Sequence, residues 1–207
     1  MALFITFEGG EGSGKSLQAR SLYKKLTDLA MPAVLTHEPG GTPFGKQVSR
    51  MLKWTRNIDI SPLAELMLFN ASRSQLVSRV IRPNLIDGKT VICDRYTDST
   101  TAYQSYGRGL DLDMVKVVNN AATRGLVPDL TVLMYISAED GLARKGSSKL
   151  DRFEHEDISF HHRVNDGYIR LAAENPERWL TVDATQGKDK IARIIWERVR
   201  LMLSGKE

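Results

Sequence analysis

One glycine-rich segment near the start of the chain constrains the fold more strongly than any other feature. Residues 9–16 read Gly-Gly-Glu-Gly-Ser-Gly-Lys-Ser and follow an apolar run at residues 3–7. The spacing G-x-x-x-x-G-K-[ST] between a strand and a helix is typical of a phosphate-binding loop, whose backbone N–H groups turn toward phosphate oxygens. Lys15 can neutralise phosphate charge, and Ser16 can ligate Mg²⁺. A flexible glycine turn is the alternative, but the flanking strand and helix argue against it.

Length and composition favour a single domain over residues 1–207. With 42% hydrophobic and 26% charged residues, the chain can bury one core. No apolar run approaches the ~18 residues of a membrane span, and the first residues lead into the loop rather than a signal peptide, so we expect a cytoplasmic protein without a membrane partner. Cys93 is the single cysteine, which excludes an internal disulfide framework. The net charge of +4 suits polyanionic substrates or nucleic acid, and does not distinguish them.

Strand and helix patterns alternate along the chain. Apolar runs predict five strands, at residues 3–7, 33–36, 90–93, 130–136 and 179–182. Helical spacing of apolar residues occurs between and after them, at 17–29, 63–80, 111–124, 157–173 and 188–203. Such alternation predicts an α/β fold in which helices flank a parallel sheet on both faces. Ligands bind beyond the carboxyl ends of such strands, where we find Gly9, Glu38, Asp94 and Ser137.

Two of these strand ends carry side chains suited to phosphate chemistry. Asp94 emerges where a carboxylate could hold Mg²⁺ or its waters, and Arg95 would then face the transferring phosphoryl group. An N-cap aspartate with a solvated arginine is the structural alternative. Glu38 and Pro39 lie in the run His-Glu-Pro-Gly-Gly-Thr, which is either a tight backbone path beside the same pocket or simply a turn.

A helical pair is suited to a nucleotide base. Phe69 and Arg73, four residues apart, could stack on a base and hydrogen-bond its edge or a phosphate. For an isolated pair, core packing plus a surface charge is the ordinary interpretation.

A basic stretch follows the fourth predicted strand. Arg144, Lys145, Lys149 and Arg152 lie among Gly and Ser residues, which predicts a mobile lid at about residues 141–153 that closes over phosphates. A solvated basic loop is the alternative. The four histidines lack the spacing of a metal site.

Six stretches of the chain together resemble the thymidylate kinase family, in order and spacing, from residue 3 to about 186. They are Phe7-Glu8-Gly9, His37-Glu38-Pro39-Gly40-Gly41-Thr42-Pro43, Phe69-Asn70-Ala71-Ser72-Arg73, Asp94-Arg95-Tyr96, Ala102-Tyr103-Gln104 and Leu150-Asp151-Arg152-Phe153-Glu154. The resemblance implies a P-loop kinase fold with a five-stranded parallel sheet, on a homodimer. It also implies transfer of the γ-phosphoryl group of ATP to dTMP with Mg²⁺, giving ADP and dTDP for dTTP synthesis, with no nucleic acid partner.

The resemblance also implies roles for individual residues. The catalytic residues would be Lys15, Asp94, Arg95, Arg144 and Arg152, with Ser16 and Asp94 at the metal. The ATP site would contain Gly9, Gly10, Glu11, Gly12, Ser13, Gly14, Lys15 and Ser16, with Gln186 in a turn near adenine. The dTMP site would contain Glu38, Pro39, Phe69, Arg73, Arg95, Thr100, Tyr103 and Gln104. Within it Phe69 would stack on thymine, Arg73 and Thr100 would bond the base edge, and Tyr103 and Gln104 would line the sugar and exclude ribose.

The chain departs from the family pattern at several positions. His37 and Ser49 stand where arginines are usual or common, although the adjacent Arg50 could replace the second if the helix is slightly rotated. The lid carries lysines and a Gly-Ser-Ser interruption where bacterial relatives have several arginines, and lysine lacks the bidentate fork. Glu11 occupies a loop position where some relatives have a catalytic arginine. Tyr135 replaces an aspartate, and the sequence offers no functional account of that change.

Rival function classes have weaker sequence support. A P-loop GTPase would need an N-K-x-D guanine-reading motif, which the chain lacks. A nucleic-acid-binding ATPase would account for the positive charge, but the chain has no RNA-binding aromatic motif. Another nucleoside monophosphate kinase is the nearest alternative.

Overall fold

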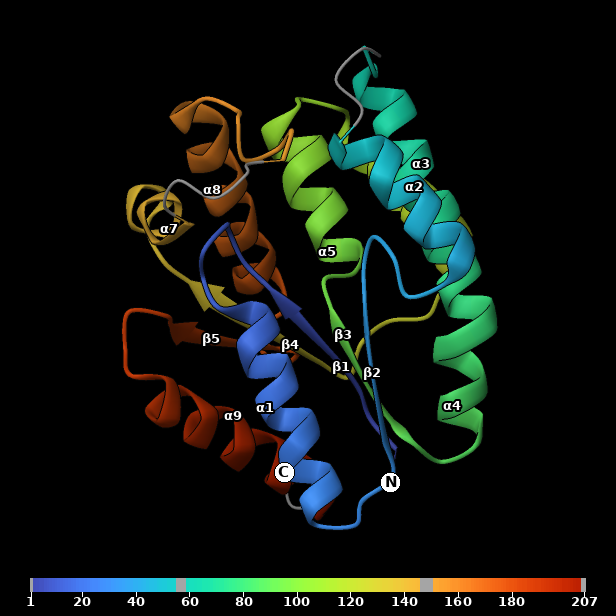
Figure 1. Cartoon of the computed structure of the whole chain (residues 1–207), viewed down its shortest axis with the longest axis vertical. Coiled ribbons are helices and arrows are strands. Elements are labelled where there is room, and N and C mark those ends of the chain that lie inside the picture. The colour runs from blue at the N-terminus through green and yellow to red at the C-terminus, as the bar shows by residue number, and fades with distance from the viewer. Residues whose placement is uncertain (1, 55–58, 146–150, 206–207) are drawn as a thin grey trace.

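A parallel sheet forms the centre of the molecule (Figure 1). The computed structural model describes residues 2–54, 59–145 and 151–205, and within them five parallel strands lie in the order β2-β3-β1-β4-β5. The strands are β1 (Phe4–Glu8), β2 (Ala33–His37), β3 (Thr90–Asp94), β4 (Leu130–Tyr135) and β5 (Trp179–Asp183). The five strands predicted from the sequence are all present, and the predicted α/β fold is confirmed.

Helices cover both faces of the sheet. They are α1 (Lys15–Asp28), α2 (Pro43–Trp54), α3 (Pro62–Leu76), α4 (Arg82–Ile86), α5 (Thr97–Thr100), α6 (Leu112–Thr123), α7 (Ala138–Lys145), α8 (Ile158–Glu174) and α9 (Lys188–Leu203), with π-helical segments η1 (Val77–Ile81) and η2 (Thr101–Gly107). Helices α1 and α9 lie side by side against one face (Figure 1). Helices α4 and α8 pack against the other face, where α8 also contacts η2.

The apolar run at residues 3–7 becomes a central strand because both of its faces are buried. Ile5 and Phe7 pack with Leu22 and Ile195 of α1 and α9, whereas Phe4 packs in a second cluster on the opposite face, with Tyr96. A parallel strand covered on both sides carries apolar residues on both faces rather than at alternate positions only; Thr6 is buried within the run, and its hydroxyl hydrogen-bonds to that of Thr131. This burial holds β1 rigid at the point where the chain enters the phosphate loop.

The helices differ in part from the sequence expectation. The stretch predicted as one helix at 63–80 comprises α3 and η1 and continues through α4 to Ile86. Helices α2, α5 and α7 and the segment η2 were not predicted. Part of the predicted lid, residues 141–145, is the end of α7, and residues 146–150, including Lys149, lie outside the described residues.

The π-helical segment η2 is a tertiary feature. At Gly107, its last residue, a Cβ would lie 2.6 Å from the ring of Phe160, so α8 can approach only a glycine there. Close packing of this kind has no periodic signal in the sequence. In the described residues, no helix is long and apolar enough to cross a membrane.

Candidate active site

The phosphate loop joins β1 to α1 and has the conformation that its glycines permit. Gly9 and Gly12 have positive φ angles of 135° and 65°. A Cβ at Gly12 would collide with the carbonyl oxygen of Gly141, because the loop passes directly against α7. The Lys15 ammonium folds back over the loop and donates to the Gly10 carbonyl at 2.5 Å and to Ser13 Oγ at 3.1 Å. The loop is therefore already curled around the position where phosphate oxygens would bind.

Two oxygen ligands meet at the start of α1. Ser16 Oγ donates a hydrogen bond to Asp94 Oδ2, which brings the end of β3 to the first turn of the helix. A hydroxyl and a carboxylate are hard ligands of the kind that Mg²⁺ takes from a protein while keeping several of its waters. Within the described residues no cluster of three or more His, Cys, Asp or Glu forms a separate metal site.

Arg95 is held from several directions. It has a φ of 71°, an uncommon value for a residue with a Cβ, and its side chain returns toward the loop. Its Nη2 donates to Glu11 Oε1 at 2.8 Å and to the Tyr103 hydroxyl at 3.3 Å. Its Nη1 donates to Ser99 Oγ at 3.2 Å and to the Tyr168 hydroxyl at 3.3 Å. A guanidinium held in this way is oriented before any substrate arrives.

Glu8 lies behind Arg95 and organises two of its partners. The Glu8 carboxylate is fully buried, and its Oε2 accepts hydrogen bonds from Ser99 Oγ at 2.5 Å and from the Tyr168 hydroxyl at 3.0 Å. Because both hydroxyls give their protons to Glu8, their lone pairs face Arg95. Burial, together with the charge of Asp98, raises the pKa of Glu8 to about 7.

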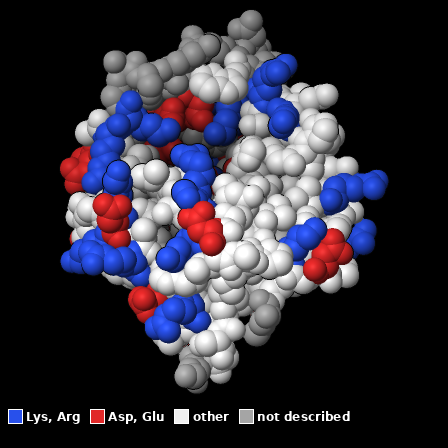
Figure 2. Space-filling view, turned by 60° about the horizontal axis from the view of Figure 1, so that its bottom comes forward, with Lys and Arg blue, Asp and Glu red and all other residues white. Residues whose placement is uncertain are grey.

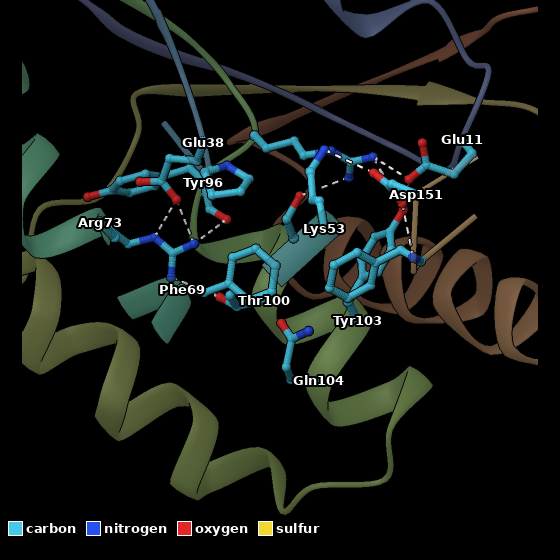
Figure 3. A pocket seen from close by; sticks show the side chains of 14 residues that line it. Glu11, Glu38, Lys53, Phe69, Arg73, Tyr96, Thr100, Tyr103, Gln104 and Asp151 are labelled. Carbon is cyan, nitrogen blue, oxygen red and sulfur yellow. Dashed lines mark hydrogen bonds and ion pairs between the residues drawn. The ribbon is translucent and has the colours of Figure 1, made fainter. Parts of the chain in front are cut away.

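A partly open cavity lies beside Arg95 (Figure 3). Glu38 and Arg73 lie at one end of it and Glu11 at the other, with the Phe69 ring between them. The cavity brings together eight of the residues predicted for the acceptor site: Glu38, Pro39, Phe69, Arg73, Arg95, Thr100, Tyr103 and Gln104. They come from five separate parts of the chain, so only the fold could assemble them.

Arg73 is the largest fully buried side chain at this cavity. Its Nε donates to Glu38 Oε2 at 2.8 Å and its Nη1 donates to Thr100 Oγ1 at 3.0 Å. The second carboxylate oxygen, Glu38 Oε1, is buried with no hydrogen-bond partner in the described residues, as is Gln104 Oε1. Burial outweighs the nearby Arg73 charge and raises the pKa of Glu38. Unpartnered polar atoms beside a cavity are available to a polar ligand.

A cleft runs from this cavity along the phosphate loop. It is lined by Lys15, Ser16 and Asp94, and by Lys145 and Glu154 from the segments on either side of residues 146–150. Figure 2 shows a hollow on the upper part of the molecule, with carboxylates inside it and Lys and Arg side chains on its sides. The cleft and the cavity adjoin at six residues that line both, among them Arg95 and Glu11.

Comparisons with known proteins identify the family. The family model described as thymidylate kinase matches residues 7–195. A curated thymidylate kinase of Dehalococcoides mccartyi is 55% identical over 203 residues, covering 98% of each chain, and one of Roseiflexus sp. is 46% identical, covering 94% of this chain and 92% of its own. The crystal structure of thymidylate kinase from Ehrlichia chaffeensis has a TM-score of 0.79 at 32% identity, covering 96% of this chain and 98% of its own. The chain belongs to the thymidylate kinase family.

Family membership establishes the class of reaction. Thymidylate kinases transfer the γ-phosphoryl group of ATP to dTMP and so form ADP and dTDP, a step in dTTP synthesis. The chain is an enzyme of this kinase class, as the combination of phosphate loop and strand-end motifs predicted.

The predicted lid residues that the structure describes contact different parts of the chain. Arg144 lies on α7 and donates from Nη1 to the carbonyl oxygen of Ala184 at 2.9 Å, two residues before Gln186. Lys145 forms an ion pair with Glu154 at 2.5 Å and lies 4.0 Å from Glu11. Arg144 therefore lies near the predicted adenine turn, and Lys145 lies near the phosphate loop.

Arg152 is turned away from the cleft. Its guanidinium forms an ion pair with the buried Glu65 of α3, and its Nε donates to the Leu52 carbonyl oxygen at 3.0 Å. Gln104 Nε2 also donates to Glu65, at 2.7 Å. In this structure Arg152 thus anchors the segment after residue 150 to helices α2 and α3.

The departures from the thymidylate kinase pattern also have definite positions. Ser49 lines the cleft, whereas Arg50 is exposed and lines neither the cleft nor the cavity. His37, which is exposed at the end of β2, also lines the cleft, whereas Tyr135 is exposed at the end of β4 and lines neither space. The rotated-helix alternative for Arg50 therefore does not describe this structure.

Sequence reasoning assigned no role to Glu8, Tyr168, Glu65 and Lys53, although Glu8 lies in one of the stretches that carry the family resemblance. Tyr168 contacts Arg95, Glu8 contacts Tyr168 and Ser99, and Glu65 contacts Arg152; these contacts join buried residues that lie far apart in the sequence. Lys53 lines both the cavity and the cleft. The sequence did indicate this position, because Lys53 lies four residues after Ser49 and hence on the same face of one helix.

Proposed function

We propose that dTMP occupies the cavity beside Arg95, that the ATP phosphates lie on residues 9–16, and that the phosphoryl group passes between them at Arg95. The observation that carries this proposal is the junction of the two spaces at the guanidinium of Arg95. In-line transfer requires donor and acceptor oxygens on opposite sides of the moving group. One cation that faces both spaces meets that requirement.

On the donor side, Ser16 and Asp94 would hold the Mg²⁺ ion, directly or through its waters. When bound, the ion supplies charge neutralisation of the ATP phosphates. Lys15 would turn from the Gly10 carbonyl to the phosphates, which offer its ammonium a stronger, charged partner. Burial and the Arg95 charge lower the pKa of Lys15 to about 8, so it remains mainly protonated at neutral pH. Gln186 would contact adenine.

On the acceptor side, Phe69 would stack on thymine while Arg73 and Thr100 bond its edge. Arg73 already contacts Thr100, so the base would join a formed network rather than create one. Glu38 and Pro39 would form the wall beside it. Tyr103 and Gln104 would face the sugar and exclude a 2′-hydroxyl.

Charge on the moving phosphoryl group would be dispersed by Lys15 and Arg95, together with Arg144 and Arg152 from the lid at about residues 141–153. For Arg152 this requires leaving Glu65, so we propose that lid closure exchanges that ion pair for a phosphate contact. Donors fixed in advance stabilise developing charge without reorganisation during the reaction.

We also propose a cytoplasmic homodimer. Leu63 and Met67 on α3 and Val117 on α6 are large, exposed apolar side chains on two helices in mutual contact. An apolar patch of this kind suits a second copy of the chain. A cytoplasmic location fits an enzyme that draws on the cellular pool of ATP and Mg²⁺.

The direct test is ADP release measured with dTMP, dUMP, dCMP, dGMP and AMP as acceptors. We expect dTMP to be preferred, and Lys15→Met to lower kcat by about 100-fold or more while melting at the wild-type temperature, because Lys15 contributes charge rather than packing. Another preferred acceptor would refute the substrate assignment. Near-normal turnover in a folded Lys15→Met would refute the role of the loop.

A further inference from the structure

We propose that Lys53, at the end of α2, binds the phosphate of the acceptor nucleotide, and that Asp151 holds its ammonium when that phosphate is absent. This inference rests on the proposed function and adds to it a binding residue outside every motif considered above. Figure 3 shows the Lys53 side chain reaching into the space between Glu38 and Glu11, with its ammonium beside Asp151.

The position of Lys53 is the first argument. The cavity and the cleft share six lining residues, which are Glu11, Glu38, Pro39, Lys53, Arg95 and Asp151. Among those described residues, Lys53 and Arg95 carry positive charge and three are carboxylates. The acceptor phosphate has to lie where the two spaces meet, since it receives the phosphoryl group from the cleft. Lys53 is at that place.

Charge balance is the second argument. Both terminal nitrogens of Arg95 already donate to protein groups, one of which is the Glu11 carboxylate at 2.8 Å. Arg95 therefore brings little uncompensated charge to the junction. A phosphate dianion placed near Glu11, Glu38 and Asp151 would meet repulsion unless a second cation were present. Lys53 supplies that cation.

Helix geometry is the third argument. Ser49 and Lys53 are four residues apart on α2, so their side chains lie on one face, and both line the open cleft. Ser49 brings no charge to that face, and the exposed Arg50 lines neither space. The positive charge that α2 brings to the junction of the cavity and the cleft is therefore that of Lys53, in the last turn of the helix.

The contact with Asp151 explains how the ammonium is held without a nucleotide. Lys53 Nζ lies 3.2 Å from Asp151 Oδ2, while Asp151 Oδ1 accepts from the backbone N–H of Phe153 at 2.9 Å and of Glu154 at 3.2 Å. One carboxylate oxygen of Asp151 thus holds Lys53, and the other accepts the two backbone hydrogen bonds. The Lys53 side chain is 34% exposed, so it can turn to a dianion, which is a stronger partner than one carboxylate.

The backbone around this pair stays anchored when the lysine changes partner. The Arg152 N–H donates to the Lys53 carbonyl oxygen at 3.2 Å, and the Arg152 side chain contacts the Leu52 carbonyl oxygen. Neither contact uses the ammonium. Lys53 can therefore move to a phosphate while α2 and residue 152 remain joined.

The test compares dTMP with thymidine, which lacks the phosphate, in calorimetric binding to full-length protein. We expect Lys53→Met to weaken dTMP binding by about tenfold and raise its KM accordingly, because one charge-assisted contact is lost. Thymidine affinity and the KM for ATP should stay within about twofold of wild type. Lys53→Arg should restore dTMP binding. The matched control is Lys46→Met, a change of the same type at an exposed position of α2 that lines neither space, and it should change nothing.

A second variant tests the exchange of partners. Asp151→Asn keeps the Oδ1 acceptor that caps Phe153 and Glu154 but removes the charge that holds Lys53, so dTMP binding should tighten severalfold. In the Lys53→Met background the same change should tighten dTMP binding less, because only the direct repulsion between Asp151 and the phosphate is then removed.

The results of these experiments distinguish a failure of the Lys53 inference from a failure of the proposed function. Unchanged dTMP affinity in Lys53→Met, or equal losses for dTMP and thymidine, would overturn this inference while leaving the proposed function intact. A wild-type protein that turns over no dTMP would overturn the proposed function and, with it, this inference.

Discussion

At the scale of single residues, the site depends on a carboxylate inside the phosphate loop. Burial alone would raise the pKa of Glu11, but the charges of Arg95 and Lys15 and a hydrogen bond from Tyr103 outweigh it and hold the pKa well below its usual range. Glu11 is therefore ionised. Its negative charge compensates the positive charge of Arg95, whereas an arginine at this loop position would add a cation to the site. The Tyr103 hydroxyl has to donate to Glu11, at 2.6 Å, so its orientation is fixed.

The first prediction concerns that hydroxyl. Tyr103→Phe keeps the ring in the aromatic cluster with Phe153 and Phe160 but removes the group that we assign to the sugar side. We expect discrimination between dTMP and its ribose counterpart to fall by about tenfold, since a fixed polar group no longer faces the 2′ position. The ratio of kcat/KM for the two substrates is the measurement. An unchanged ratio would transfer the filter to the ring or to another residue.

A second prediction concerns Asp94, which we propose to hold Mg²⁺. Asp94→Asn should lower kcat and raise the Mg²⁺ concentration needed for half-maximal rate, because a neutral amide is a poorer partner for a hard cation or its waters. The Asn oxygen can still accept from Ser16, so the strand end should stay folded. The check is a Mg²⁺ titration of rate at saturating dTMP, alongside a melting curve. A titration identical to that of wild type would make Asp94 a structural residue.

The sequence predicted residues that belong to local motifs better than residues that act across the fold. Lys15, Asp94 and Arg95 follow strands directly, and parallel strands bring their carboxyl ends to one edge. Glu8 and Glu65 were missed because their partners lie far along the chain, Glu8 with Tyr168 and Glu65 with Arg152. Glutamates in such positions resemble ordinary surface residues until tertiary packing buries them.

At the scale of elements, the segment after residue 150 is fastened to two helices. Arg152 and Arg108 both form ion pairs with Glu65 of α3, and Arg152 also contacts the carbonyl end of α2. Arg144 reaches instead from α7 to the turn after β5. If the proposed lid closes over nucleotide, Arg144 and Arg152 therefore have to leave different partners.

The third prediction distinguishes the effects of replacing Arg144 and Arg152. Arg144→Ala and Arg152→Ala should each lower kcat by at least about 100-fold, with dTMP affinity nearly unchanged, as expected when charge is supplied mainly in the transition state. Arg152→Ala should also lower the melting temperature, because the buried Glu65 loses a partner, whereas Arg144→Ala should not. Steady-state kinetics and thermal melts measure both effects. Wild-type kcat in both variants would leave Lys15 and Arg95 to carry the charge alone.

At the scale of the whole molecule, strand number and type followed from the sequence, whereas several helices did not. The strands are buried apolar runs with a strong signal, and the loop motif sets where the ligand edge lies. Segments α5 and η2 lack that signal because they mix Thr, Ser, Gln and Tyr around one cavity and are shaped by what they contact. The acceptor side of the site, built on α5 and η2, was thus less predictable as structure than the phosphate loop and the strand ends.

The last prediction follows from a buried acid in the centre of this fold. The pKa of Glu8 is raised from 4.5 to about 7, chiefly by burial and then by the charge of Asp98, against opposition from Ser99 and Arg95. Between those two values the native state holds a proton that the unfolded chain has lost. The stability contributed by Glu8 is therefore full below about pH 4.5 and is lost as pH rises through 7.

Glu8→Gln should remove that part of the pH dependence. From pH 5 to pH 8 the melting temperature of wild type should fall by several degrees relative to the variant, because one pKa unit corresponds to about 1.4 kcal/mol and 1 kcal/mol to ~2–4 °C in a chain of this size. The amide can still accept from the Tyr96 N–H, at the 2.7 Å contact that Glu8 Oε1 now makes. Glu174→Gln, an exposed change on α8, is the matched control and should follow wild type at every pH. If the melting temperatures of Glu8→Gln and wild type change with pH in the same way, Glu8 is ionised throughout this range, held so by Arg95 and the two hydroxyls that donate to it.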